Sequence, residues 1–165
     1  MRYVALYLVA IVAANLIVAW QGAWITPITA FVFIGFDITC RDYLHEAWHR
    51  RHLWPKMFAL VIAGSLISYL INQGAWRIAV ASAVAFALSG AVDALIYQVL
   101  YKRHKLVKIN GSNVFSAAVD SIAFPTIAFG VFMPWIILGQ FAAKVGGGFL
   151  WSLVLHRRSY AKSVV

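Results

Sequence analysis

Residues 3–20 read YVALYLVAIVAANLIVAW and contain no charged side chain. A helix needs about 20 apolar residues to cross roughly 30 Å of hydrocarbon, so this stretch is long enough to span a membrane. Further apolar stretches follow at residues 25–43, 55–71, 77–101, 113–130 and 132–155. They lack sustained alternation and are much longer than the about 9–11 residues of a membrane strand. The pattern predicts an all-α polytopic membrane protein with six transmembrane helices.

The composition of the chain agrees with this interpretation. Of its 165 residues 63% are hydrophobic and 12% are charged, and the mean hydropathy is +0.82. Typical soluble domains are about 45–50% apolar and about 25% charged. A soluble globular protein is therefore excluded, and residues 1–165 are expected to form a single integral membrane domain in contact with the lipid bilayer.

The distribution of basic residues predicts the orientation of the helices. The chain carries 14 Lys and Arg against five acidic residues, a net charge of +9. Most of the basic residues fall at one set of predicted helix ends: Arg2, Arg41, Arg50, Arg51, Lys56, Lys102, Arg103, Lys105, Lys108, Arg157, Arg158 and Lys162. By the positive-inside rule both termini are expected in the cytoplasm, with the protein in the inner (plasma) membrane. The basic excess is thus a topology signal, and no nucleic-acid partner is expected.

Ionisable side chains inside the predicted spans are the first candidates for function. A charge at the centre of a membrane helix costs at least about 2.5–3.5 kcal/mol on insertion scales. The side chains in question are Asp37, Asp93, Asp120 and Lys144. They could converge on one cavity, or Lys144 could pair with one Asp as a structural contact between helices. Uncharged polar groups at comparable depth include Asn15, Asn113 and Gln140, and together these groups form a predicted polar seam inside the bundle.

Two of the acids also suggest an internal symmetry. Asp37 lies in the second stretch and Asp120 in the fifth. With three helices in each half, these stretches would correspond in a 3+3 inverted repeat of the kind found in transporters. The alternative is six helices without internal symmetry.

A short motif points to a different chemistry. Residues 45–49, with His45, Glu46 and His49, match H-E-x-x-H, the zinc-binding pattern of many metalloproteases. An intramembrane zinc protease is therefore one alternative. However, the motif runs into Arg50 and Arg51 at the predicted cytoplasmic interface, and no segment offers an obvious third ligand. A solvated, topology-setting loop is favoured, so we expect a non-enzyme with no catalytic residue, metal or cofactor.

Two segments resemble a known family. Residues 31–39, FVFIGFDIT, precede an arginine-rich loop, and residues 113–124 read NVFSAAVDSIAF. Both are similar to signatures of the putative vitamin uptake transporter family, whose characterised members import queuosine precursors. The resemblance spans nearly the whole chain. It implies a six-helix carrier for a 7-deazaguanine such as 7-cyano-7-deazaguanine, working by alternating access.

The resemblance also implies roles for the candidate residues. A carboxylate offers two acceptors in one plane, so Asp37 or Asp120 could accept hydrogen bonds from the ring N–H and the exocyclic amine of such a substrate. Lys144, Asn113 or Gln140 could donate to its carbonyl, and Phe36 or Phe124 could stack on its ring. Asp93 and Lys144 lie where the family carries polar residues.

One further alternative concerns the organisation of transport. The substrate-binding membrane subunit of an energy-coupling-factor vitamin transporter is also a compact six-helix protein, but it needs a separate ATPase module. The sequence is compatible with this alternative, and with either a monomer or a homodimer.

Overall fold

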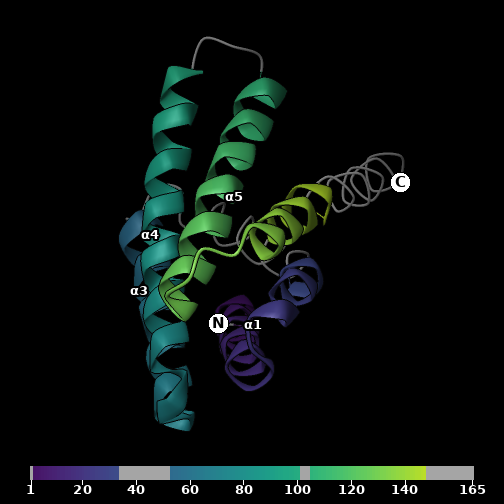
Figure 1. Ribbon diagram of the computed structural model, residues 1–165. Helices are drawn as coiled ribbons and strands as arrows, with labels where there is room; N and C mark the ends of the chain where they lie inside the picture. Colours follow the sequence, from purple (N-terminus) through teal and green to yellow (C-terminus); the bar gives the residue numbers. More distant parts are fainter. Residues whose placement is uncertain (1, 34–52, 101–104, 148–165) are drawn as a thin grey trace, which may run out of the picture.

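The computed structural model describes residues 2–33, 53–100 and 105–147, and these are helical nearly throughout, with no strand among them (Figure 1). The helices coincide with the six apolar stretches, so the prediction of an all-α fold is confirmed. In chain order the elements are α1 Arg2–Gln21, the 3-10 turn η1 Ala23–Ile25, a helix at 26–33, α3 Leu53–Ile71, the 3-10 turn η2 Gln73–Ala75, α4 Trp76–Val99, α5 Lys105–Phe129 and a helix at 134–147.

Two segments of the described residues are long and apolar enough to cross a membrane, Val4–Gln21 and Gln73–Asp93. The helices at Ala23–Phe33 and Pro55–Ile71 are apolar but shorter. These lengths fit a membrane protein. The six-span topology stays a prediction.

The fifth helix begins earlier than the sequence predicts. α5 starts at Lys105, whereas the apolar stretch starts at residue 113. The intervening residues are too polar for a hydrophobic span, but they include no proline and so do not interrupt helical hydrogen bonding. The expectation that Lys105 and Lys108 lie in a connecting loop is therefore wrong, because hydropathy marks the apolar part of a helix and not its full length.

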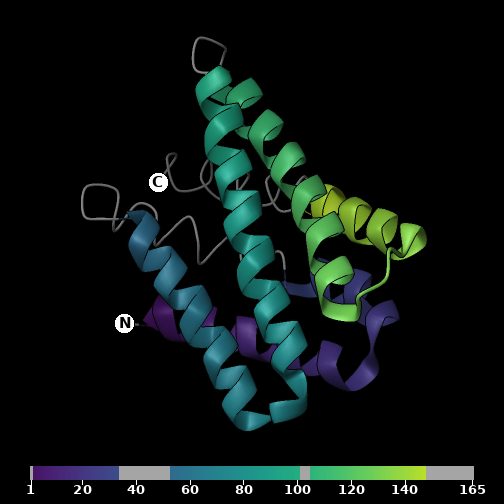
Figure 2. The ribbon, with the colours of Figure 1, turned by 60° about the vertical axis from the view of Figure 1, so that its left-hand side comes forward.

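The helices are arranged around a long antiparallel pair. α4 and α5 pack against each other more extensively than any other pair among α1, α3, α4 and α5. Figures 1 and 2 show this pair upright, with α1 and the helix at 134–147 lying across it. The turn from α3 to α4 lies at the bottom of both views, and the adjacent ends of α4 and α5 lie at the top. In that turn the Asn72 side chain accepts a hydrogen bond from the Gly74 N–H at 3.0 Å, which satisfies a backbone donor at the chain reversal.

Two apolar clusters hold the helices together. One joins α1 to α3 and consists of Tyr7, Met57 and Val61. The other joins α1, α4 and α5 and consists of Val18, Ile78, Ala81 and Ala128, with Phe124 packed against it. The second cluster places the end of α1 against the second half of α5, which is the half that carries the buried polar residues described below.

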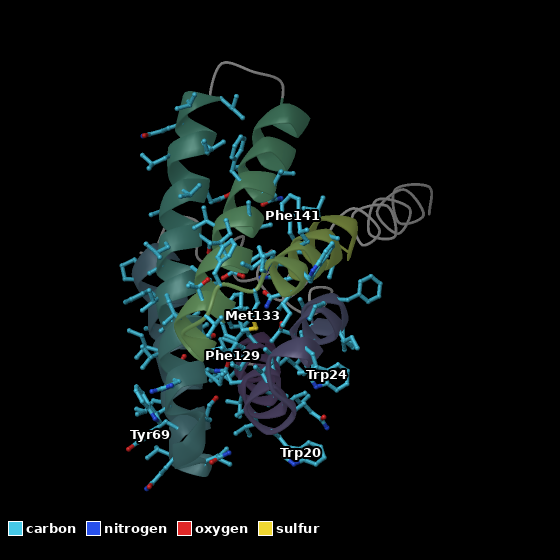
Figure 3. The ribbon with its side chains drawn as sticks, in the orientation of Figure 1. Trp20, Trp24, Tyr69, Phe129, Met133 and Phe141 are labelled. Atoms are coloured by element: carbon cyan, nitrogen blue, oxygen red, sulfur yellow. The ribbon has the colours of Figure 1, made fainter. Side chains whose placement is uncertain are left out.

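Four tryptophans at or near helix ends are exposed. Trp20 and Trp24 lie at the end of α1 and in η1, Trp76 begins α4, and Trp135 lies in the first turn of the helix at 134–147. Figure 3 shows Trp20 and Trp24 directed away from the rest of the structure. Exposed indoles at helix ends are typical of side chains that lie at the headgroup level of a bilayer.

α1 and α3 approach closely at Gly64. A Cβ at this position would lie 2.7 Å from Cγ2 of Ile11 on α1, a distance that real Cβ contacts essentially never show. Small residues at such crossings let the backbones of membrane helices come close. A Cβ at Gly146, in the helix at 134–147, would meet no heavy atom within 4 Å. Gly146 can therefore serve as the control for a substitution at Gly64.

We expect Gly64→Ala to lower the melting temperature of the detergent-purified protein, because overpacking costs about 1–3 kcal/mol. Gly146→Ala should leave it unchanged or raise it, because alanine is favoured over glycine in a helix by about 0.5–1 kcal/mol. The double variant Gly64→Ala/Ile11→Ala should recover part of the loss. Equal melting temperatures for Gly64→Ala and Gly146→Ala would show that the close contact is not limiting.

Candidate functional site

The central feature of the candidate site is an ion pair between two helices. Lys144, on the helix at 134–147, contacts Oδ2 of Asp120 on α5 with its ammonium group. The two side chains are 18% and 29% exposed, respectively. Lys144 Nζ also donates to Oε1 of Gln140, one turn earlier on its own helix, at 3.2 Å. A partly buried cation and anion compensate each other's loss of hydration only if both are well hydrogen-bonded. The Gln140 amide adds one such hydrogen bond to Lys144.

Packing on both sides holds the helix at 134–147 in place. A Cβ at Gly139 would lie 3.0 Å from Cγ of Pro27, so this helix packs closely against the helix at 26–33. Phe129, the last residue of α5, packs against the cluster formed by α1, α4 and α5. Figure 3 shows Phe129 and Met133 where the chain passes from α5 to the helix at 134–147, and Phe141 further along that helix. The reversal between the two helices thus directs Lys144 toward Asp120.

Two buried polar atoms beside the ion pair have no hydrogen-bond partner in the described part of the chain. They are Oγ of Ser121, which follows Asp120, and Nε2 of Gln140. Ser121 is 0% exposed and Gln140 is 2% exposed. Most buried polar groups in proteins are hydrogen-bonded, so each exception needs an explanation.

A second polar contact joins α1 to α3. The buried Asn15 donates from Nδ2 to Oγ of Ser68 at 3.2 Å, and Ser68 donates to the carbonyl of Gly64 at 2.8 Å. This arrangement is an interhelical hydrogen bond of the kind that holds membrane helices together. Oγ of the neighbouring Ser65 is buried without a partner among the described residues.

The structure brings some of the predicted site residues together and separates others. Asp120, Lys144 and Gln140 form one cluster. Asn113 is exposed on α5 and is not hydrogen-bonded to that cluster. Phe124 packs against the apolar cluster of α1, α4 and α5, and its stacking on a ligand stays a prediction. Asn15 contacts Ser68 instead of an acid.

Asp93 is separate from the ion pair. It lies on α4, and its Oδ1 is buried without a hydrogen-bond partner in the described ranges. The sequence left open whether the four ionisable groups converge on one cavity or Lys144 pairs with one Asp, and of the three that are described, Asp120 and Lys144 are in contact. Asp93, on α4, therefore does not take part in the ion pair between α5 and the helix at 134–147.

Several predicted residues lie outside the described ranges. These are Asp37 and Phe36 of the second stretch and the motif residues His45, Glu46 and His49. Within the described ranges, no group of three or more His, Cys, Asp or Glu side chains is placed to hold a metal ion.

Ser121 was not among the predicted site residues. A hydroxyl in a membrane helix usually bonds to a carbonyl of its own helix, so a lone serine gives little signal. The available signal was its position, directly after a buried acid and four residues before Pro125. A proline at that position removes the backbone donor that would bond to the carbonyl of Ser121.

Comparison with known proteins gives one match. The model of a family described as putative vitamin uptake transporter matches residues 2–155, nearly the whole chain. Comparison with curated proteins and with solved structures gave no match.

We expect Lys144→Met to destabilise the protein, because it leaves the Asp120 carboxylate without its cation. Removing one partner of a fully buried pair costs about 3–5 kcal/mol, and because the carboxylate is 29% exposed we expect a loss of about 1–3 kcal/mol. The double variant Lys144→Met/Asp120→Asn should recover part of the lost stability, because it no longer contains the unpaired carboxylate. The measurement is thermal unfolding in detergent.

The control for loss of a positive charge is Arg77→Met. Arg77 is exposed at the start of α4 and stacks over the Trp76 ring at 5.3 Å. We expect little change in its melting temperature. If Lys144→Met and Arg77→Met behave alike, the ion pair does not stabilise the fold.

Proposed function

The chain belongs to the putative vitamin uptake transporter family, and on that premise we propose that it takes up a queuosine precursor, a 7-deazaguanine such as 7-cyano-7-deazaguanine, by alternating access. We place it in the inner membrane with both termini in the cytoplasm. The family match supports the transport of a small molecule across a membrane. The observation that carries the narrower proposal is the ion pair of Lys144 and Asp120, with unpartnered buried polar atoms beside it.

The charge balance of this cluster favours a neutral solute. Lys144 and Asp120 contribute one positive and one negative charge, so a charged ligand would bring an uncompensated charge into a weakly hydrated site. A neutral polar ring brings only hydrogen-bonding groups. A 7-deazaguanine is planar and neutral, and its edges carry several donors and acceptors.

The carboxylate suits the donor edge of such a ring. Lys144 contacts Oδ2 of Asp120, which leaves Oδ1 to accept from a ligand. A ring N–H and an exocyclic amine lie side by side on a guanine-like edge, and hydrogen bonds to a charged acceptor are worth about 1.5–3 kcal/mol. In this proposal Asp120 is the main ligand contact of the second half of the chain, with Lys144 as its counter-ion.

The first half of the chain contributes a second set of contacts in this proposal. Asp37 would accept from the ligand as Asp120 does, and Phe36 would stack on the ring. Alternation of access would then occur as the two halves move about the ligand, as in transporters built from inverted repeats. Asp93 would line the path on α4.

We expect Asp120→Asn to lower uptake of 7-cyano-7-deazaguanine into liposomes that contain the purified chain. The amide keeps the size of the side chain but loses the charge-assisted bond, a difference of about 1.5–3 kcal/mol or more than tenfold in affinity. Ser116→Ala, which removes a hydroxyl that bonds within the same helix, is the matched control and should transport normally. Wild-type uptake by Asp120→Asn would remove Asp120 from the site.

The wild-type chain alone should transport in liposomes and discriminate among ligands. We expect binding of the deazaguanine to exceed that of guanine and of unrelated vitamins at least tenfold, measured by titration calorimetry. Ligand binding without transport would favour the substrate-binding subunit of an energy-coupling-factor system. Equal binding of guanine and the deazaguanine would count against the narrow substrate assignment.

A further inference from the structure

The contact with Lys144 determines which way the Gln140 amide faces. An ammonium group can only donate hydrogen bonds, so the amide atom that lies 3.2 Å from Lys144 Nζ must be the oxygen. The amide nitrogen, with its two N–H donors, therefore faces away from Lys144. Nε2 is buried and has no partner among the described residues. Gln140 thus holds a directed, unused donor beside the ion pair.

Among the described helical hydroxyls, those of Ser121 and Ser65 are buried without a hydrogen-bond partner. Ser68, Ser89, Ser116 and Thr126 each donate to a carbonyl of their own helix, at distances of 2.6–3.2 Å. Ser121 is fully buried, yet its Oγ has no partner in the described part of the chain. The hydroxyl is therefore free to bond to something other than its own helix.

The backbone at Ser121 adds an acceptor to this hydroxyl. α5 continues through Pro125, and proline has no N–H. The carbonyl of Ser121, four residues earlier, cannot receive the usual helical hydrogen bond. Carbonyls freed in this way line the ligand cavities of many membrane transporters.

The two orphan groups lie on the two helices that form the ion pair, near its members in the sequence. Ser121 directly follows Asp120 on α5, and Gln140 lies one turn before Lys144 on the neighbouring helix. Buried polar groups without partners are unfavourable, and apolar side chains would fill the same space at lower cost. A ligand that supplies the missing partners would account for both groups.

We propose that Ser121 and Gln140 recognise the acceptor edge of the transported solute, and that Lys144 is a positioning residue that directs the Gln140 amide. The inference rests on the proposed function and assigns Lys144 an indirect role. The Gln140 amide and the Ser121 hydroxyl donate to the two lone pairs of the ring carbonyl, while Asp120 accepts from the adjacent ring N–H as in the proposed function. A donor beside an acceptor matches a neutral lactam edge, and it does not match a carboxylate, which offers acceptors only.

The test compares two ligands on the purified full-length chain by titration calorimetry. One is 7-cyano-7-deazaguanine, and the other is the analogue in which hydrogen replaces the ring carbonyl oxygen, so that the adjacent ring nitrogen also loses its proton. We expect the wild-type protein to bind the first about tenfold or more tightly. Ser121→Ala and Gln140→Met should each weaken binding of the first ligand about tenfold and leave binding of the analogue nearly unchanged, so that the preference between the two ligands falls about tenfold.

A second variant at Gln140 separates recognition from folding. Gln140→Glu keeps the length of the side chain and an oxygen for Lys144 but removes the N–H donors. It should reduce the ligand preference as Gln140→Met does, and it replaces Gln140→Met in the test if that variant does not fold. Ser116→Ala, which removes a hydroxyl that bonds within α5, is the matched control and should keep the wild-type preference.

The positioning role of Lys144 has its own readout. Lys144→Arg retains donors for the Gln140 oxygen and should keep the preference between the two ligands. Lys144→Met frees the amide to rotate and should reduce the preference although Gln140 is present. A purely structural lysine would change stability in Lys144→Met without changing the ratio of the two affinities.

The outcomes distinguish the two proposals. If the wild-type protein binds neither ligand, the proposed function is rejected. If it binds and prefers the deazaguanine, but Ser121→Ala and the folded Gln140 variant keep the wild-type ratio of affinities, this inference is overturned and the proposed function stands.

Discussion

Charges placed inside a hydrophobic bundle must find partners within the protein, and the contact of Lys144 with Asp120 satisfies that constraint here. For the two side chains to meet, α5 and the helix at 134–147 must be neighbours, with the chain reversing between Phe129 and residue 134. The close approach of Gly139 to Pro27 then ties the helix at 26–33 to the same assembly. Several contacts between helices that are far apart in the sequence therefore depend on where one ion pair forms.

The ion pair leaves some of the polar groups around it unsatisfied. Lys144 uses the oxygen of Gln140, and the amide nitrogen is left buried without a partner in the described ranges, as is the hydroxyl of Ser121. Asn15 and Ser68 are hydrogen-bonded to each other between α1 and α3, and of the polar groups beside them the Ser65 hydroxyl is buried without a partner among the described residues. The first arrangement is typical of a site prepared for a ligand, and the second of a structural contact between helices. This difference between two buried polar clusters connects the packing of the protein to its proposed role in uptake.

Hydropathy predicted the helices well because the cost of exposing backbone groups to lipid acts on each segment separately. It predicted the start of α5 poorly, since the first turns from Lys105 onward are polar yet helical. Of the polar residues that the sequence places at depth, Asp120, Lys144 and Gln140 form one cluster. The missing partner for Asp93 and the orphan hydroxyl of Ser121 could not be predicted, because neither follows from the properties of a single helix.

Asn113 and Asp120 illustrate the boundary between what the sequence alone determined and what the tertiary structure decided. They are seven residues apart, two turns of helix, so the sequence by itself places them on the same face of α5. It also determined that the chain is helical and apolar, with a few polar groups at depth, because these properties follow from local composition and spacing. Only the tertiary structure decided that the helix at 134–147 reaches Asp120 while Asn113 stays exposed. The physical reason is that a side chain's partner depends on where another helix crosses, and that crossing is fixed by packing between segments distant in the chain.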